Sequence, residues 1–241
     1  MTDENRAPLP EIFFRLSGSG RSPWEIHRAQ PVISKLVEQN IFQGEVLDIG
    51  CGIGDNAIHI AKHAKNVRLT AIDFVCCLFF CFDDWRTSIS FSTQVPKALE
   101  IAREKAERDN ILIQFELVNF LDDLSSTKLA KHSFDTVLDC AVFHCFSDQD
   151  RQHFLDNLQY VIKPAGLYIQ LCISEKETRI NIGPRYIKKS DLTSLFSPVN
   201  GWTIESIEDV IFISRSESPL GLESQAYLSL IRRHSSTLIE H

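Results

Sequence analysis

The sequence predicts an α/β fold with a single Rossmann-like, doubly wound sheet that is mostly parallel, has helices on both faces and includes an antiparallel strand near the C-terminus. Three observations lead to this prediction. From Glu45 onward, short apolar runs alternate with amphipathic segments, which is typical of a parallel sheet wrapped by helices. Residues 46–54 (VLDIGCGIG) join the first apolar run to a glycine-rich turn. An acid, Asp73, follows about 20 residues later.

The periodicity of apolar residues places the elements. Candidate strands span 45–50, 67–72, 113–118, 134–139 and 166–173, and candidate helices between them span 54–64, 96–109 and 149–162. Apolar residues recur at helical spacing in the stretch after Pro31. Ser22 and Glu25 have the spacing of a capping box, with Pro23 at the first helical position, so we expect a short helix to begin there.

The C-terminal part is expected to complete the sheet. After a helix at 189–196, residues 202–207 and 210–214 are two further apolar runs with Asp209 at a tight junction between them. So short a connection cannot make a parallel crossover, so this pair should contribute an antiparallel strand.

One domain accounts for the length. The chain has 241 residues, and 44% of them are hydrophobic, which is enough to bury a substantial core. Residues 1–21 include the run Ser17-Gly18-Ser19-Gly20 and are expected to form a flexible N-terminal segment. Residues 22–241 are expected to form the domain.

Charge and composition argue against several classes of partner. The net charge of -7 repels phosphate backbones, so nucleic acid is not expected. Residues 1–10 do not resemble a secretion signal, and the strongly apolar run at 75–82 is too short to cross a bilayer, so we expect a cytoplasmic protein without a membrane partner. The seven cysteines are expected to be reduced, and none has Cys-x-x-Cys spacing, so no metal site is predicted. The sequence predicts no oligomeric state.

The glycine-rich turn is the strongest indication of a ligand. It would bring bare backbone to the carboxyl edge of the sheet, where α/β proteins bind ligands, and Asp73 could accept hydrogen bonds from both hydroxyls of a ribose. The alternative for Asp73 is a helix cap or turn aspartate. A pyrophosphate is disfavoured because the third glycine is at the wrong position and Asp55 beside the helix start would repel it, which argues against a nicotinamide oxidoreductase.

At residues 48–54 the sequence resembles the class I S-adenosylmethionine-dependent methyltransferases, whose first motif is a strand ending in Asp-x-Gly-x-Gly-x-Gly. Residues 134–139 resemble the fourth strand of that family. Residues 161–166 resemble the turn before the fifth strand, with Ala165 in place of a common glycine. Residues 22–31 are similar to the N-terminal Pro-Trp-acid segment of the small-molecule branch that includes thiopurine, thiol and halide methyltransferases.

The resemblance implies a set of residues that bind S-adenosylmethionine. The methionine end would lie at the turn and the ribose and adenine at the end of the second strand, while the Pro-Trp-acid segment and the ends of the third and fourth strands would border the pocket. In full, the implied cofactor-binding residues are Trp24, Asp48, Gly50, Cys51, Gly52, Gly54, Asp73, Phe74, Asn119, Phe120 and Asp139. At Asn119 the family often has an acid, so the hydrogen bond to the adenine amine would lack charge here.

The sequence indicates the residues that could contact the methyl acceptor less clearly. Phe13, Phe14 and Trp24 could form an apolar lid over the acceptor, or simply pack at a helix start. Arg185 could meet an anionic acceptor, or be a surface arginine after a Gly-Pro turn. His144 could serve as a general base for a phenol or alcohol, or be a packed histidine beside the pocket.

Residues 75–94 interrupt the resemblance. They fit neither a short loop nor a helix, and without them Phe74 would join Val95-Pro96 in a short turn with Pro96 at the first helical position. We hypothesise that this insertion is a translated intron or a splice variant; the alternative is a lineage-specific loop over the ligand.

Together these features predict an enzyme that transfers a methyl group from S-adenosylmethionine to a small molecule, namely a thiol, a halide or a hydroxylated aromatic compound, by in-line displacement. The alternative is a catalytically silent protein that keeps the fold and binds S-adenosylmethionine without turnover, because the insertion lies directly after the residues implied to bind ribose and adenine.

Overall fold

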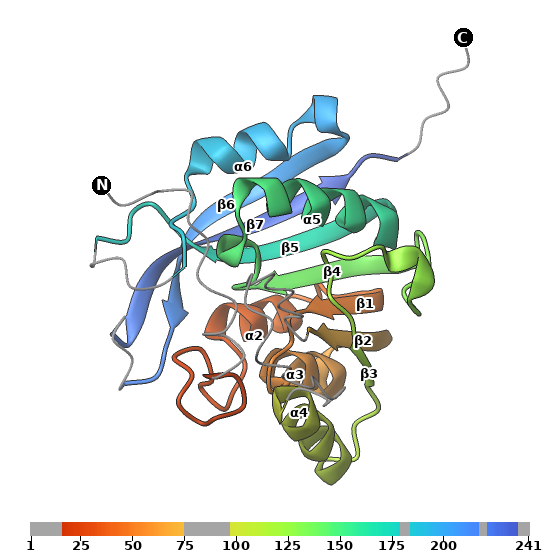
Figure 1. Cartoon of the computed structure of the whole chain (residues 1–241), viewed down its shortest axis with the longest axis vertical. Coiled ribbons are helices and arrows are strands. Elements are labelled where there is room, and N and C mark those ends of the chain that lie inside the picture. Colours follow the sequence, from red (N-terminus) through yellow and green to blue (C-terminus); the bar gives the residue numbers. More distant parts are fainter. Residues whose placement is uncertain (1–15, 75–96, 179–183, 217–220, 236–241) are drawn as a thin grey trace, which may run out of the picture.

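The computed structural model describes residues 16–74, 97–178, 184–216 and 221–235. Its centre is one seven-stranded sheet (Figure 1). The strands are β1 (Gly44–Ile49), β2 (Val67–Asp73), β3 (Gln114–Leu117), β4 (Phe134–Cys140), β5 (Ile162–Ile173), β6 (Trp202–Ile213) and β7 (Glu223–Arg233). The helices are α2 (Pro31–Glu38), α3 (Asp55–His63), α4 (Lys97–Arg108), α5 (Asp148–Val161) and α6 (Lys189–Leu195), with three 3₁₀ turns, η1 (Leu124–Ser126), η2 (Phe143–Cys145) and η3 (Pro198–Asn200).

The strand order is β3-β2-β1-β4-β5-β7-β6, and β1 to β5 pair with one another in parallel. β7 runs antiparallel between β5 and β6. The predicted fold class is therefore confirmed. The chain order reverses between β1 and β4, and the carboxyl ends of these two strands form the switch point where sheets of this kind bind ligands.

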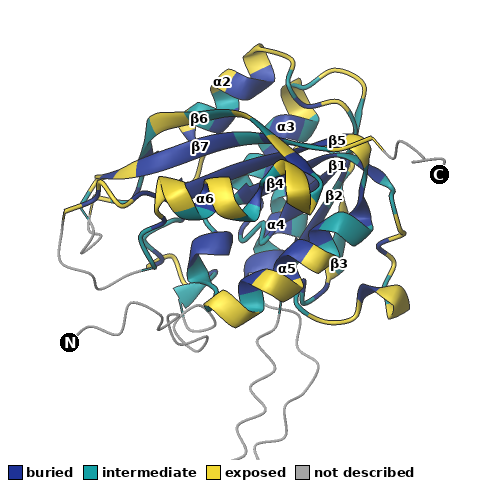
Figure 2. Ribbon diagram, turned by 90° about the horizontal axis from the view of Figure 1, so that it is seen from above, coloured by how far each residue is buried: buried dark blue, intermediate teal, exposed yellow. Residues whose placement is uncertain are grey.

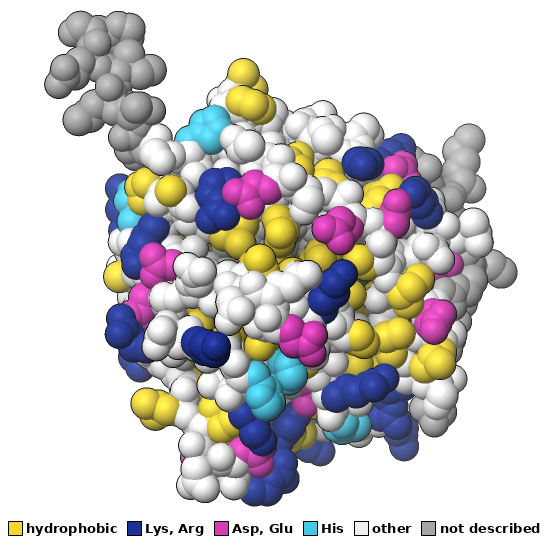
Figure 3. All heavy atoms as spheres, turned by 180° about the vertical axis from the view of Figure 1, so that it is seen from behind, with side chains coloured by type: hydrophobic (Ala, Val, Ile, Leu, Met, Phe, Trp, Pro, Cys, Tyr) yellow, Lys and Arg dark blue, Asp and Glu magenta, His cyan; other side chains and the backbone are white. Residues whose placement is uncertain are grey.

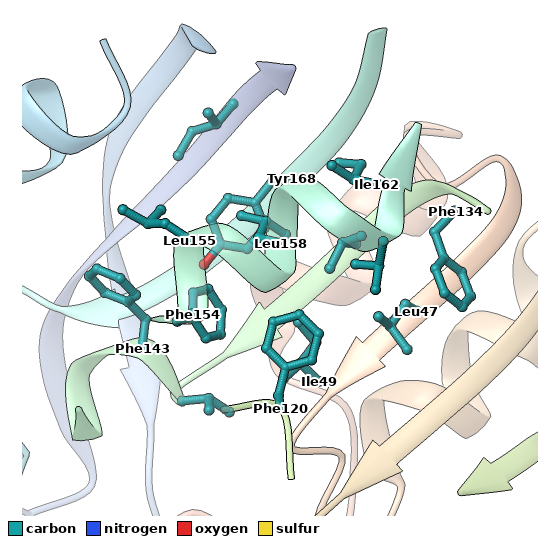
Figure 4. Close-up of a cluster of buried hydrophobic side chains, with 14 of the residues drawn as sticks. Leu47, Ile49, Phe120, Phe134, Phe143, Phe154, Leu155, Leu158, Ile162 and Tyr168 are labelled. Atoms are coloured by element: carbon teal, nitrogen blue, oxygen red, sulfur yellow. The ribbon is translucent and has the colours of Figure 1, made fainter. Parts of the chain in front are cut away.

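Helices cover both faces of the sheet. Figure 2 shows α2 and α3 on one face and α5 and α6 on the other. Under α2 and α3 lies an aliphatic cluster that includes Ile33, Leu36 and Ile60. Under α5 and α6 lies an aromatic cluster, part of which Figure 4 shows, where Phe154 packs against Tyr168 and other rings. The two apolar layers pack against opposite faces of the sheet, so the strand ends that carry polar residues are held rigidly.

The C-terminal prediction was partly wrong. Residues 202–213 form one continuous strand, β6, with a bulge between Ile204 and Ser206, and Asp209 pairs with Tyr227 within it. The antiparallel strand is β7, which the sequence analysis missed. β6 lies at the edge of the sheet, so Asp209 can point its carboxylate outward to Lys176 without ending the strand.

The prediction of a helix that starts at Ser22 was also wrong. Residues 22–25 form a turn in which the Glu25 N–H donates to the Ser22 carbonyl at 3.2 Å, while the side chains of both residues bond to residues that precede them. Ser22 Oγ donates to the carbonyl of Leu16, and the Gly18 N–H donates to Glu25 Oε1. Residues 16–21, assigned to a flexible segment, therefore share hydrogen bonds with the start of the domain.

Several predictions fall outside the described residues or are left untested. Phe13, Phe14 and residues 75–94 lie outside the described part of the chain. No helix in that part is long and apolar enough to cross a membrane. On the face in Figure 3, lysine and arginine side chains are interspersed with acids. The cytoplasmic location and the absence of nucleic-acid partners stay predictions.

Candidate functional site

The glycine turn after β1 lies at the switch point of the sheet. Gly50, Gly52 and Gly54 have φ angles of 65°, 53° and 77°, a region that side-chain-bearing residues rarely adopt. A Cβ on Gly50 would lie 2.4 Å from Val142 Cγ2, and one on Gly54 would lie 2.9 Å from Ala102 Cβ. A Cβ on Gly52 would meet nothing within 4 Å. Packing therefore requires two of these glycines, while Gly52 leaves bare backbone beside open space.

Asp48 lies in β1, two residues before Gly50, and is buried. Its Oδ2 atom has no hydrogen-bond partner among the described residues. Burial raises the pKa of Asp48 well above its ordinary value, and the charges of Asp73 and Asp139 add to the effect. A buried carboxylate oxygen without a donor is costly, so the turn is suited to a ligand that brings a cationic N–H group.

Asp73 joins the end of β2 to the glycine turn. Its Oδ2 accepts from the Gly52 N–H at 2.8 Å and its Oδ1 accepts from the Phe74 N–H at 2.8 Å. Burial raises the pKa of Asp73 to about 6, against the lowering effect of these two hydrogen bonds. Each carboxylate oxygen keeps a further lone pair, so the turn role and a ribose-binding role are compatible.

Two further predicted cofactor residues, Trp24 and Cys51, are half-buried and pack against the aliphatic cluster under α2 and α3. Burial raises the pKa of the Cys51 thiol well above its usual range, so the thiol is neutral and is not activated as a nucleophile.

Asn119 and Phe120 follow β3, next to Asp73. The Asn119 side chain bonds within its own turn, donating to Asp122 Oδ1 at 2.8 Å and accepting from the Leu121 N–H at 3.1 Å. Phe120 is buried, with its ring centroid 5.1 Å from that of Phe154. The structure thus gives both residues packing roles, and contact with an adenine stays a prediction.

Asp139 ends β4 and is fully buried. Its carboxylate accepts from the N–H groups of Val142 and Phe143 at 2.9 and 3.1 Å and from the Tyr168 hydroxyl at 2.9 Å. Burial raises the pKa of Asp139 to about 6, although these donors lower it. Asp139 therefore shapes the turn that leads into η2, and the position of Val142 against Gly50 depends on it.

His144 lies in η2 and is 3% exposed. Its Nδ1 accepts from the Ile173 N–H at 3.0 Å, and the ring also bonds to the backbone of Ala141. Burial lowers the pKa of His144 to about 3, so the ring is neutral. These contacts fit the packed-histidine alternative, because a general base needs a free lone pair that faces the acceptor.

Arg185 is tied to the same region. It donates to the carbonyl of Phe146 at 2.9 Å and lies 2.7 Å from Asp148 Oδ1. Its neighbour Arg151, which was not predicted as a site residue, is buried over the Phe143 ring. Among the described residues, the Nε and Nη2 atoms of Arg151 have no hydrogen-bond partner. Charged residues on the first turn of a helix usually face water, so nothing local in the sequence indicated this burial.

The described residues contain no group of three His, Cys, Asp or Glu side chains that could hold a metal ion. Three buried or partly buried carboxylates, those of Asp48, Asp73 and Asp139, lie near the open glycine backbone at the switch point.

A family profile described as a methyltransferase domain matches residues 86–166, roughly a third of the chain. This match does not include the glycine turn. Together with the sheet order and the solved structures below, this match shows a methyltransferase-like fold.

A curated relative aligns with most of the chain. The chain is 25% identical over 191 residues to the 2-heptyl-1-hydroxyquinolin-4(1H)-one methyltransferase of Mycobacteroides abscessus, which spans 78% of this chain and 72% of the relative.

Two solved structures extend the likeness over nearly the whole chain. One is described by the conversion of a disulfide bond into a thioacetal group during echinomycin biosynthesis, with a TM-score of 0.72, 25% identity and coverage of 95% and 94%. The other is the 1,6-didemethyltoxoflavin-N1-methyltransferase of Burkholderia thailandensis with S-adenosylhomocysteine bound, with a TM-score of 0.63, 18% identity and coverage of 95% and 93%. The latter likeness concerns the fold alone.

Proposed function

We propose that this chain binds S-adenosylmethionine at the glycine turn and transfers its methyl group to a small molecule. The observation that carries the proposal is the buried Asp48 Oδ2 without a donor, next to the open backbone of Gly52. An amino-acid ammonium group would supply the missing donor, and the adjoining Asp73 would accept from ribose hydroxyls. The residues present therefore fit this cofactor.

In this proposal the chain binds the methyl donor and aligns it with the acceptor. When bound, S-adenosylmethionine supplies an activated methyl group on a sulfonium. The rigid turn and the Asp48 and Asp73 carboxylates fix the two ends of the donor, while apolar side chains such as Trp24 exclude water. His144 is poorly suited to accept a proton here, because its ring bonds to the backbone of Ile173 and Ala141 and burial lowers its pKa to about 3.

Because His144 is engaged by backbone, the proposal favours acceptors that need no base. Halides are already anionic, and thiols and acidic hydroxylated aromatic compounds ionise unaided. We propose a hydroxylated aromatic compound as the first choice, because the curated relative acts on a hydroxyquinolinone. The thiopurine, thiol and halide branch stays an alternative acceptor class.

Calorimetry with S-adenosylmethionine and S-adenosylhomocysteine tests the binding step. A screen of N-hydroxyquinolones, phenols, thiols, thiopurines and halides, with release of S-adenosylhomocysteine as the readout, then tests transfer. Lack of binding contradicts the proposal. Binding without transfer to any acceptor favours the catalytically silent alternative.

The Asp48→Asn substitution tests the role of the unpaired oxygen. It removes the charge that would meet the ammonium group, so we expect affinity for S-adenosylmethionine to fall about 10- to 100-fold without loss of folding stability. The control is Asp135→Asn, whose carboxylate bonds to Lys163 and to the Glu45 N–H near the start of β4. Equal affinity losses in both variants would contradict a specific role for Asp48.

A further inference from the structure

Arg151 on α5 is a buried cation with one unpaired hydrogen-bonding edge. The residue is 4% exposed, and its guanidinium carbon lies 4.8 Å from the centroid of the Phe143 ring. Its Nη1 atom lies 3.3 Å from Asp148 Oδ1, whereas Nε and Nη2 have no hydrogen-bond partner among the described residues. A buried donor without an acceptor is costly, and the cost is larger when the donor is charged.

The two unpaired nitrogens share one edge of the guanidinium plane. In arginine, the N–H bonds of Nε and Nη2 point in nearly the same direction, and this fork matches the two oxygens of a carboxylate. Both atoms are shielded from water, so an anion that reaches them must displace neighbouring side chains. In return it gains two charge-assisted hydrogen bonds away from solvent. The edge therefore suits a planar anion with two oxygens better than a halide ion.

The charge of Arg151 is incompletely balanced. Asp148 Oδ1 lies closer to Arg185 Nη2, at 2.7 Å, than to Arg151, and the Asp148 side chain is 57% exposed. Burial lowers the pKa of Arg151 to about 10, and the charge of Arg185 adds to this effect, although the charges of Asp148 and Asp191 oppose it. An anion at the unpaired edge would therefore be stabilised.

A short run of contacts connects this cation to the proposed cofactor site. The N–H of Phe143, whose ring lies against Arg151, donates to Asp139 Oδ2 at 3.1 Å. The preceding residue, Val142, packs so closely on Gly50 that a Cβ there would lie 2.4 Å from its Cγ2 atom. Arg151 therefore adjoins the β4 side of the glycine turn, where an acceptor can be held next to a bound methyl donor.

We propose that Arg151 determines acceptor specificity by binding a carboxylate of the methyl acceptor through Nε and Nη2. This inference rests on the proposed function and narrows the acceptor to a hydroxylated or thiol-bearing aromatic acid. Arg185, which the sequence suggested for an anionic acceptor, pairs with Asp148 and donates to the Phe146 carbonyl. Arg151 binds the acceptor away from the reacting atom and takes no part in the displacement itself.

Pairs of acceptor analogues that differ only in charge test the proposal. We expect the wild type, saturated with S-adenosylhomocysteine, to bind 4-hydroxybenzoate about tenfold more tightly than 4-hydroxybenzamide in calorimetry. The pair 4-mercaptobenzoate and 4-mercaptobenzamide extends the comparison to thiols. Arg151→Met removes the fork and should abolish the preference in each pair. Arg151→Lys keeps the charge without the fork, so its preference should be intermediate.

Thermal unfolding separates this role from a purely structural one. Arg151→Met replaces a buried, partly unpaired charge by an apolar side chain of similar length, so its unfolding midpoint should equal or exceed that of the wild type. A structural role for Arg151 predicts the reverse pattern, in which the midpoint falls and the preference for the carboxylate persists.

The matched control is Arg233→Met. Arg233 is half-buried near the other end of α5, and its Nη1 donates to the carbonyl of Gln159 at 2.7 Å and to the carbonyl of Ile162. Because these carbonyls lose a donor, we expect a lower unfolding midpoint. The preference for 4-hydroxybenzoate over 4-hydroxybenzamide should match that of the wild type.

The outcomes distinguish this inference from the proposed function. If the wild type binds S-adenosylhomocysteine but shows no preference for the carboxylate in either pair, or if Arg151→Met keeps the preference, only the role of Arg151 is overturned. If the wild type does not bind S-adenosylhomocysteine, the proposed function fails, and benzoate binding that Arg151→Met abolishes would still support an anion site. A preference lost in Arg151→Met and kept in Arg233→Met supports the inference.

Discussion

At the scale of single residues, the site is a set of buried acids held apart by backbone donors. Asp73 and Asp139 are each satisfied by N–H groups of the turns they adjoin, whereas one oxygen of Asp48 is not. The folded protein therefore disfavours charge at the place where the proposed cofactor carries positive charge and hydroxyl donors. Ligand binding and carboxylate ionisation should be coupled.

The pH dependence of binding follows from Asp73. Its pKa in the folded protein is raised to about 6, so its contribution to stability is present below the unfolded pKa and is lost as pH rises through about 6. Ribose hydroxyls donate to the ionised form, so affinity for S-adenosylhomocysteine should rise between about pH 5 and 7 and binding should release protons. Calorimetry in two buffers with different ionisation enthalpies measures the release. An unchanged pH profile in Asp73→Asn would contradict this account.

Gly52 and Gly20 provide a matched pair for the open backbone. Both have positive φ, and a Cβ on either meets nothing within 4 Å, so alanine should cost a similar amount of stability, roughly 1–2 kcal/mol. We expect Gly52→Ala to lose S-adenosylmethionine binding, because the methyl group occupies the proposed ligand space, while Gly20→Ala keeps it. Urea unfolding and calorimetry together separate the two effects.

At the scale of elements, α5 fixes the β4 end of the site. Its apolar side carries Phe154, which packs against Phe120, Phe143 and Tyr168. Tyr168 in turn donates to Asp139, which sets the turn that places Val142 against Gly50. Packing on this face is thus linked to the geometry of the glycine turn through one buried hydrogen-bond network.

The Phe154→Ala substitution should lower the free energy of unfolding by about 3–5 kcal/mol, because it opens a cavity among fully buried rings. Its neighbour His153 is exposed on the same helix, so His153→Ala should change stability by less than about 0.5 kcal/mol. Urea denaturation measures both, and a small effect at Phe154 would contradict the packing role assigned to α5.

At the scale of the whole molecule, the reversal of strand order brings three distant acids together. Asp48, Asp73 and Asp139 lie at or one residue before the carboxyl ends of the neighbouring strands β1, β2 and β4, and the antiparallel β7 and the edge strand β6 widen the sheet away from them. Gln30 links β6 to α3, because its side chain bonds to both the N–H and the carbonyl of Ile213 and its own N–H donates to Asn56 Oδ1.

The insertion at 75–94 gives a prediction at this scale. β2 ends at Asp73 and α4 begins at Lys97, so joining Phe74 to Val95 would restore a short connection. We expect the chain without residues 75–94 to fold and to bind S-adenosylhomocysteine at least as tightly as the full chain. Mass spectrometry of the natural protein tests the origin of the insertion: peptides from within 75–94 would exclude a translated intron.

Much of the fold could be predicted from the sequence because its strongest signals are local. Apolar runs alternating with amphipathic stretches determined the five parallel strands and their helices, since burial of each element's face is recorded in its own periodicity. The glycine spacing and Asp73 likewise determined where a ligand site should lie, because left-handed turns restrict the residue type directly.

Only the tertiary structure decided the features that depend on distant partners. β7 has charged ends and an irregular burial pattern, and it forms a strand because β5 and β6 pair with it on both sides. Glu25 and Arg151 look like surface charges in the sequence, yet packing of remote segments buries them. His144 looks like a candidate base, yet its ring is engaged by the backbone of Ile173. Periodicity and spacing describe neighbours along the chain, whereas burial and hydrogen-bond partners at these positions come from segments far away in it.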